Sequence, residues 1–318
     1  MATKKSYEKE IKVEKTNIQR YHNAIYNNGS YAFNGFGENL YFKSDRTEKL
    51  DSNFNRSNGE SLKGYGLEIE TECWSISNSL VYGTFLQNYL FNIFPKHLFK
   101  IQQDMSLRGG NVSGECISQV MTQEFIRNNY ANFKAMFDSF QDFDISCSRT
   151  GHCGMHINIS NALFGKTKEE QMENINKFYY LINKHYTLFK NLYLRKCTDY
   201  CEQMRVSKEY AKSLTERDYN SMASHTCCLN YSHFQDGRIE LRLPSGQANF
   251  NDFRNTMELT FHLVNVIKTL KWEQLDNIEE IFKNCNEFVL QRLEQKGNLN
   301  LSTLRKIREN VKVSKNIK

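Results

Sequence analysis

Three short segments alternate between apolar and polar residues, and this pattern constrains the fold more than any other feature of the chain. They read GYGLEIETEC from Gly64, CGMHINIS from Cys153 and GRIELRLP from Gly237. Successive side chains of a strand point to opposite faces, so each segment predicts a half-buried β-strand. Long, continuously apolar strands, which a buried parallel sheet needs, are absent, and the pattern therefore indicates a largely antiparallel sheet.

Helical periodicity fills most of the chain between and after these strands. Apolar residues recur every three or four positions over 122–143 and 168–195, and again in two segments after residue 250, and a further helix is expected over 80–94, ending before Pro95. Such spacing gives a helix one apolar face. A further short strand is expected at FKIQQD, from Phe99. Together these elements predict the α+β class, with an antiparallel sheet packed by long helices.

The polar faces of the three strands carry residue types that bind cations and phosphates. Glutamates at i and i+2 on one strand lie about 7 Å apart, and they repel unless a cation lies near them. Magnesium prefers such oxygen ligands. A guanidinium group can bind a phosphate or a carboxylate through two parallel hydrogen bonds. A single charged face is also what a solvated strand presents, but three in one chain favour a metal and phosphate site. The residues are Glu68, Glu70, His156, Asn158, Arg238, Glu240 and Arg242.

Two further acids lie between the first and second of these strands, in QQDMSLRGGNVSGECISQ. Asp104 and Glu115 are additional candidate ligands, and the glycines around them permit tight turns. From spacing alone, a hairpin with solvated acids is the favoured interpretation of this segment.

Composition sets broad limits on the chain. Its 318 residues can bury a large core, and the net charge of +6 suits an anionic ligand without requiring one. Nine irregularly spaced cysteines, after a charged start without an apolar stretch, predict reduced thiols and a cytoplasmic location. No run approaches the length of a membrane span. We expect an N-terminal extension at 1–60, a catalytic domain at 61–295 and a basic tail at 296–318.

The ordered set of motifs resembles the catalytic core of the glutamine synthetase and glutamate–cysteine ligase superfamily, and most closely its small amidoligase branch, often encoded by bacteriophages and bacteria. The Gly-x-Glu-x-Glu strand of that family resembles Gly66 to Glu70, and its Ser-Gly-Met-His strand resembles Cys153 to His156. Its Arg-x-Glu-x-Arg-x-Pro strand resembles RIELRLP from Arg238. The D-x-S and E-x-x-S elements of amidoligases resemble DMS from Asp104 and ECIS from Glu115.

The resemblance implies an ATP-dependent ligase that joins a carboxylate to an amine with two or more Mg²⁺ or Mn²⁺ ions. By this resemblance, Glu68, His156 and Glu240 hold one ion, and Glu70, Asp104 and Glu115 hold another. Arg238 and Asn158 are expected to bind ATP, with Arg238 on its phosphates, and Arg242 to bind the substrate carboxylate or the acyl phosphate. The expected partners are small-molecule, peptide or protein substrates, with no membrane and no nucleic acid.

Other interpretations of the sequence remain open. A phosphotransferase of the guanidino kinase type and a non-catalytic module that binds nucleotide or metal are the alternatives to a ligase. Cys197, Cys201, Cys227 and Cys228, with His225 and His233, could form a zinc site, although adjacent cysteines are awkward ligands for one ion. Cys153 beside His152 suggests a nucleophile, but neighbours on a strand face opposite ways, so a buried thiol is favoured.

Overall fold

The structure is a computed structural model. It describes residues 63–75, 86, 89–90, 92–94, 98–102, 107, 112–148, 151–196, 200–204, 207–222 and 226–316. The expected N-terminal extension lies outside these residues. The described chain forms two compact units, and the division falls inside one strand, between Met155 and His156. The first unit contains residues 66–155 and 246–250. The second contains residues 63–65, 156–245 and 251–318.

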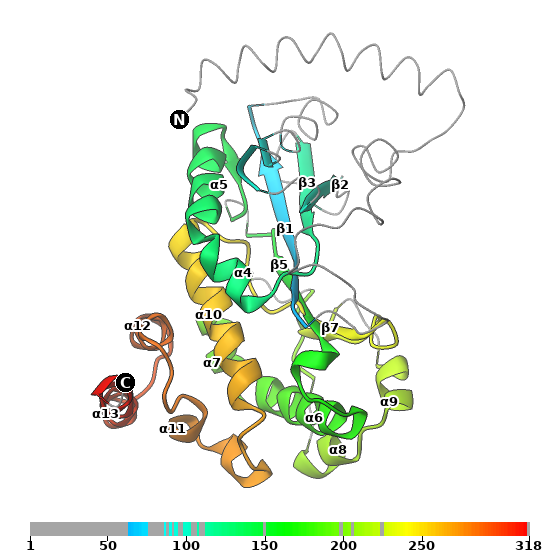
Figure 1. The fold of residues 1–318 in the computed structure, drawn as a ribbon, viewed down its shortest axis with the longest axis vertical. Coiled ribbons are helices and arrows are strands. Elements are labelled where there is room, and N and C mark those ends of the chain that lie inside the picture. The colour runs from blue at the N-terminus through cyan, green and yellow to red at the C-terminus, as the bar shows by residue number, and fades with distance from the viewer. Residues whose placement is uncertain are drawn as a thin grey trace. The chain divides into compact units, whose positions relative to one another are not determined.

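The first unit joins most of the N-terminal strands to a helical pair (Figure 1). Strand β3 pairs antiparallel with both β1 and β2, and β4 pairs antiparallel with β1. The aromatic rings of Phe94 and Phe133 meet edge to face, 4.9 Å apart, and bury the apolar side of α5. The elements are β1 (Tyr65–Cys73), β2 (Phe99–Gln102), β3 (Val112–Ser118), α4 (Gln123–Asn128), α5 (Tyr130–Asp142) and β4 (Ile145–Ser146).

The second unit holds the remaining strands and the C-terminal helices (Figure 1). β7 pairs antiparallel with β5 and β6, and α6 packs against α8 and η3. The elements are β5 (Met155–Ser160), η2 (Asn161–Leu163), α6 (Lys168–Lys184), α7 (Tyr186–Leu192), α8 (Lys208–Ser213), α9 (Glu216–Ser221), β6 (Leu229–Asn230), β7 (Arg238–Leu241), α10 (Phe250–Val266), η3 (Trp272–Asp276), α11 (Ile278–Ile281), α12 (Glu287–Lys296) and α13 (Leu301–Asn316).

The observed class is α+β, as predicted. The strand order is β2-β3-β1 in the first unit, with β4 on β1, and β5-β7-β6 in the second, and every pairing whose register is described is antiparallel. The apolar residues of the alternating segments are buried as expected: Ile157 lies opposite Leu241, and Ile159 opposite Ile239, all fully inaccessible. Their polar neighbours therefore share the other face of the strands.

Three predicted helices are each divided in the structure, and the last of them, expected to run from Ile278 to Leu293, forms α11 and α12 with Asn284 at φ +59° between them. The segment 122–143 forms α4 and α5, which meet at Asn129, and 168–195 forms α6 and α7, which meet at His185. At Asn129 the backbone leaves the helical conformation, with φ −102° and ψ 15°, and its side chain donates to the Phe125 carbonyl. The polar, basic chain end, where a tail was expected, forms α13, which packs on α11 and α12 through the buried Ile307 and Val311. No helix in the described part of the chain has the length and apolar character needed to cross a bilayer.

Acid should weaken the second unit through His262. This side chain stacks on Phe282, and its Nε2 lies 2.8 Å from the Ile281 carbonyl oxygen, so the neutral ring donates there. Burial lowers the pKa of His262 below its usual value of 6.5. The unfolded chain therefore binds the proton more readily, and stability present above pH 6.5 falls as the pH drops through and below that value.

The His262→Gln variant keeps an amide donor for Ile281 and removes the titration. We expect its free energy of unfolding in urea, measured from pH 7.5 to pH 5, to fall less steeply than that of the unmodified chain. An identical pH slope in the two proteins would show that His262 does not carry this effect.

Candidate functional site

In the first unit, an acidic face forms where β1 lies beside β3. Glu70 is directly opposite Glu115, and Glu68 is opposite Ile117. Directly opposed residues of an antiparallel pair share one face and have Cβ atoms about 5 Å apart. The structure therefore brings together Glu70 and Glu115, which were predicted to hold the same ion. Glu70 is buried, while Glu68 and Glu115 are half-buried.

Backbone hydrogen bonds fix the Glu70 carboxylate. The amide of Gly154 donates to Glu70 Oε2, and the amide of Glu70 donates to the Gly154 carbonyl oxygen at 3.2 Å. Gly154 directly precedes β5. The bond from Gly154 sets the direction of the carboxylate. Asp104, the third predicted ligand of this ion, lies outside the described residues.

Ser118, the last residue of the predicted E-x-x-S element, has a structural contact. Its Oγ accepts a hydrogen bond from the Leu67 amide at 2.8 Å and donates to the Gln119 carbonyl oxygen at 2.8 Å. It thereby joins the ends of β1 and β3.

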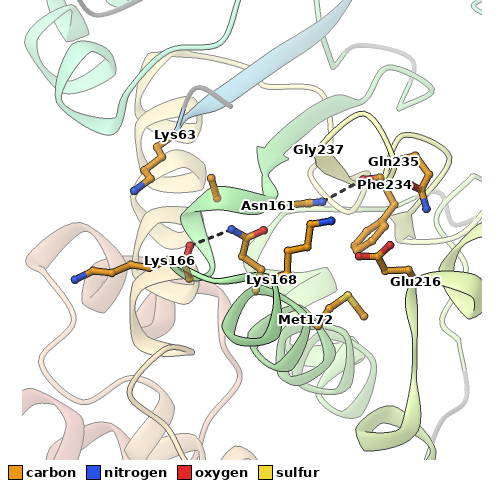
Figure 2. Close-up of a pocket in the computed structure, with 12 residues that line it drawn as sticks. Lys63, Asn161, Lys166, Lys168, Met172, Glu216, Phe234, Gln235 and Gly237 are labelled. Carbon is orange, nitrogen blue, oxygen red and sulfur yellow. Dashed lines mark hydrogen bonds between the residues drawn. The ribbon is translucent and has the colours of Figure 1, made fainter. Parts of the chain in front are cut away.

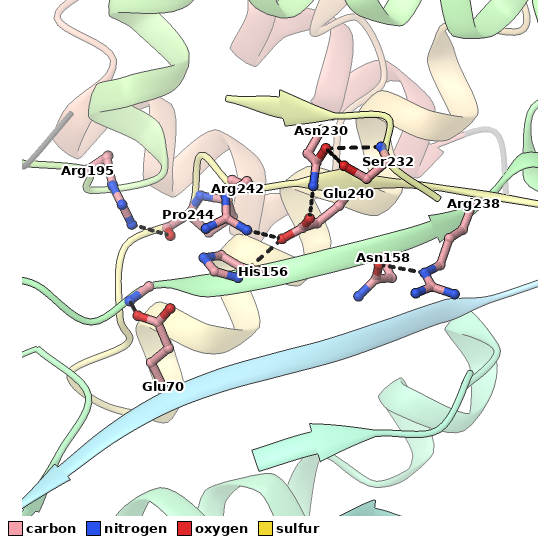
Figure 3. Close-up of polar contacts among 11 residues, drawn as sticks. Glu70, His156, Asn158, Arg195, Asn230, Ser232, Arg238, Glu240, Arg242 and Pro244 are labelled. Carbon is pink, nitrogen blue, oxygen red and sulfur yellow. Dashed lines mark hydrogen bonds and ion pairs between the residues drawn. The ribbon is translucent and has the colours of Figure 1, made fainter. Parts of the chain in front are cut away.

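In the second unit, β5, β6 and β7 present a second polar face. Glu240 lies opposite Asn158 on one side and Asn230 on the other, and Ser160 lies opposite Arg238. The Nε of Arg238 donates to Asn158 Oδ1 at 3.0 Å, so the two predicted ATP-binding residues are in contact (Figure 3).

Glu240 is the centre of this face (Figure 3). Its carboxylate is 5% exposed, and its Oε1 accepts from Arg242 Nη1 at 2.6 Å. The same oxygen lies 3.2 Å from His156 Nδ1. Its Oε2 accepts from Asn230 Nδ2 at 2.7 Å. Three predicted site residues thus meet here, together with an asparagine that the sequence reasoning missed. Asn230 occupies a two-residue strand, which alternation patterns cannot detect.

The carboxylate oxygen and imidazole nitrogen atoms on this face are suitable ligands for a divalent metal ion. Adjacent ligands of an octahedral ion at about 2.1 Å are about 3 Å apart, close to the 3.2 Å between Glu240 Oε1 and His156 Nδ1. Carboxylate oxygens suit Mg²⁺ and Mn²⁺, and one imidazole is compatible with Mn²⁺. Arg242 Nε is buried and has no hydrogen-bond acceptor among the described residues.

The cysteines do not complete a zinc site in the part of the chain that the structure describes. Cys201 and Cys228 are buried free thiols, and His233 pairs with Asp236 at 2.9 Å. Cys197 and His225 lie outside the described residues. Cys153 is fully buried, and burial, together with the nearby Cys147, Glu72 and Glu70, raises the pKa of its thiol. A protonated thiol is a poor nucleophile, in agreement with the prediction of a buried reduced cysteine.

A cavity of about 360 Å³ lies in the second unit, beyond the end of β5 (Figure 2). Asn161, which follows β5, and Gly237, which precedes β7, line one side, and Lys63, Lys166 and Lys168 give it a basic character. Asn161 donates to the Phe234 carbonyl oxygen at 3.2 Å. No predicted site residue lines this cavity.

Comparison with known proteins does not establish a family. No protein family pattern matches the chain, and no curated protein matches it. Among solved structures, a bifunctional glutathione synthetase from Pasteurella multocida is similar, with 12% identity and a TM-score of 0.38. The match covers 78% of this chain and 46% of that protein, so the chain spans less than half its length.

Proposed function

We propose that the chain is an ATP- and Mg²⁺-dependent carboxylate–amine ligase of the amidoligase kind. The observation that supports it most is the arrangement around Glu240, whose Oε1 lies 3.2 Å from His156 Nδ1 on a face that also carries Arg238, Asn158 and Arg242. The β1–β3 face, where Glu70 lies opposite Glu115, adds a pair of closely set carboxylates for the second metal ion. A cytoplasmic location is part of the proposal.

Two ions are assigned to these residues. We assign one ion to His156 and Glu240 in the second unit and the second ion to Glu70 and Glu115 in the first, while Glu68 and Asp104 stay predicted ligands from the sequence.

The chemistry follows from charge. A carboxylate is a poor electrophile, and transfer of the ATP γ-phosphoryl group to its oxygen releases ADP and gives an acyl phosphate. The amine nitrogen then attacks the acyl carbon, phosphate leaves, and a base takes the amine proton. Bound Mg²⁺ would neutralise phosphate charge. Arg238, oriented by Asn158, would hold the ATP phosphates, and Arg242 would hold the carboxylate that is activated.

The test is release of ADP from ATP and Mg²⁺ with mixtures of carboxylic acids and amines, including hydroxylamine. We expect ADP release only when both a carboxylate and an amine are present, and hydroxamate when hydroxylamine is the amine. ADP release with a guanidino compound alone would favour a phosphotransferase. Metal binding without any substrate-dependent ADP would favour the binding module and contradict the ligase.

A further inference from the structure

Asn230 has a fixed orientation next to Glu240. It is 1% exposed, and its Oδ1 accepts two hydrogen bonds from Ser232, from the amide at 3.0 Å and from Oγ at 2.7 Å. With its oxygen directed at Ser232, the amide nitrogen must face Glu240 Oε2, to which it donates at 2.7 Å (Figure 3). The order Ser232, Asn230, Glu240 is therefore a directed chain of hydrogen bonds.

Glu240 has a competing partner on its other oxygen. Arg242 Nη1 already binds Oε1 at 2.6 Å. Guanidinium groups bind carboxylates most strongly through two parallel hydrogen bonds. Rotation of the Glu240 carboxylate toward Arg242 would bring Oε2 to Nη2, the nitrogen that forms a parallel pair with Nη1, and would turn Oε1 away from His156.

Asn230 opposes this rotation because it holds Oε2 on the opposite side. We propose that Asn230 is a positioning residue, which keeps Glu240 from pairing with Arg242 through both oxygens and so presents Oε1 beside His156 Nδ1 as a ligand for a divalent ion. The inference rests on the proposed function, which supplies the ion. Groups that orient metal ligands typically contribute 10- to 100-fold to metal affinity.

The experiment measures Mn²⁺ binding to the full chain by titration with electron paramagnetic resonance. Asn230→Leu keeps the size of the side chain and removes the donor, and we expect Mn²⁺ affinity to fall about 10- to 100-fold. The double variant Asn230→Leu/Arg242→Lys should recover most of that loss, because lysine cannot form the two-pronged pair. Recovery by a second change is a result that a merely structural role for Asn230 would not produce.

Two controls accompany these variants. Asn174→Leu removes another buried asparagine, which donates to the Phe164 carbonyl oxygen, and it should leave Mn²⁺ affinity unchanged. Ser232→Ala changes an exposed residue, so it should fold even if Asn230→Leu does not, and it should weaken Mn²⁺ binding by a smaller factor. Unchanged affinity in both Asn230→Leu and Ser232→Ala, or no recovery in the double variant, would overturn the inference while leaving the ligase proposal intact. Absence of Mn²⁺ binding by the unmodified chain would overturn both.

Discussion

Glu240→Gln is expected to lower Mn²⁺ affinity and ligase turnover by at least about 100-fold, because a direct ligand contributes more than the 10- to 100-fold of a group that orients one. The amide is neutral and has one oxygen. One end must face the Arg242 Nη1 donor, and the other must face the Asn230 donor. Whichever way the amide turns, its NH₂ group meets a donor. The variant therefore loses both the charge and the alignment of the carboxylate.

Glu294→Gln is the matched control for this variant. Glu294 also accepts from an arginine, Arg308, but on the exposed surface of the C-terminal helices. An exposed pair of this kind contributes little to stability, so we expect unchanged Mn²⁺ binding. Equal Mn²⁺ affinity of Glu240→Gln and Glu294→Gln, in folded protein, would remove Glu240 from the metal site.

Gly246→Ala is expected to destabilise the first unit by more than about 4 kcal/mol, the range reserved for severe packing defects. A Cβ on Gly246 would lie 1.5 Å from the Cys147 carbonyl oxygen and 2.9 Å from Cys153 Cβ. The Gly246 amide donates to the Cys153 carbonyl oxygen at 2.8 Å, so the backbone cannot withdraw without breaking this bond. The free energy of unfolding in urea measures the effect.

Gly151→Ala separates crowding from backbone strain in the same unit. Gly151 has φ +76°, and a Cβ there would meet no atom within 4 Å. Its substitution should cost only the strain of a left-handed residue, about 1–2 kcal/mol. Similar losses in the two variants would show that crowding at Gly246 is relieved at little cost.

The strands and their faces could be predicted because alternation is a local property. Leu67 and Ile69 are buried, as the pattern required, but Glu70 and Glu72 are buried as well, so β1 is covered on both faces and is not the half-buried strand that was predicted. The helix breaks at Asn129 and His185 could not be predicted, because the apolar spacing continues on both sides of each. Local hydrogen bonding, such as that of Asn129 to Phe125, ends the helix without disturbing the spacing.

The candidate site was predicted only in part, because its contacts join residues distant in the sequence. Spacing alone favoured a solvated hairpin for Glu115, and only the register of β1 with β3 places it opposite Glu70. Asn230 has no periodic signal, and its role becomes visible only where β6 pairs with β7. The predicted domain limits, and the roles of the individual site residues, stay predictions until they are measured.

Anomalous X-ray scattering from a crystal of the chain grown with Mn²⁺ and an ATP analogue tests the central claim most directly. The account predicts at least two Mn²⁺ peaks, one bonded to His156 and Glu240 Oε1 and one bonded to Glu70 and Glu115. A well-ordered crystal with the nucleotide bound and no Mn²⁺ peak at either set of residues would contradict it.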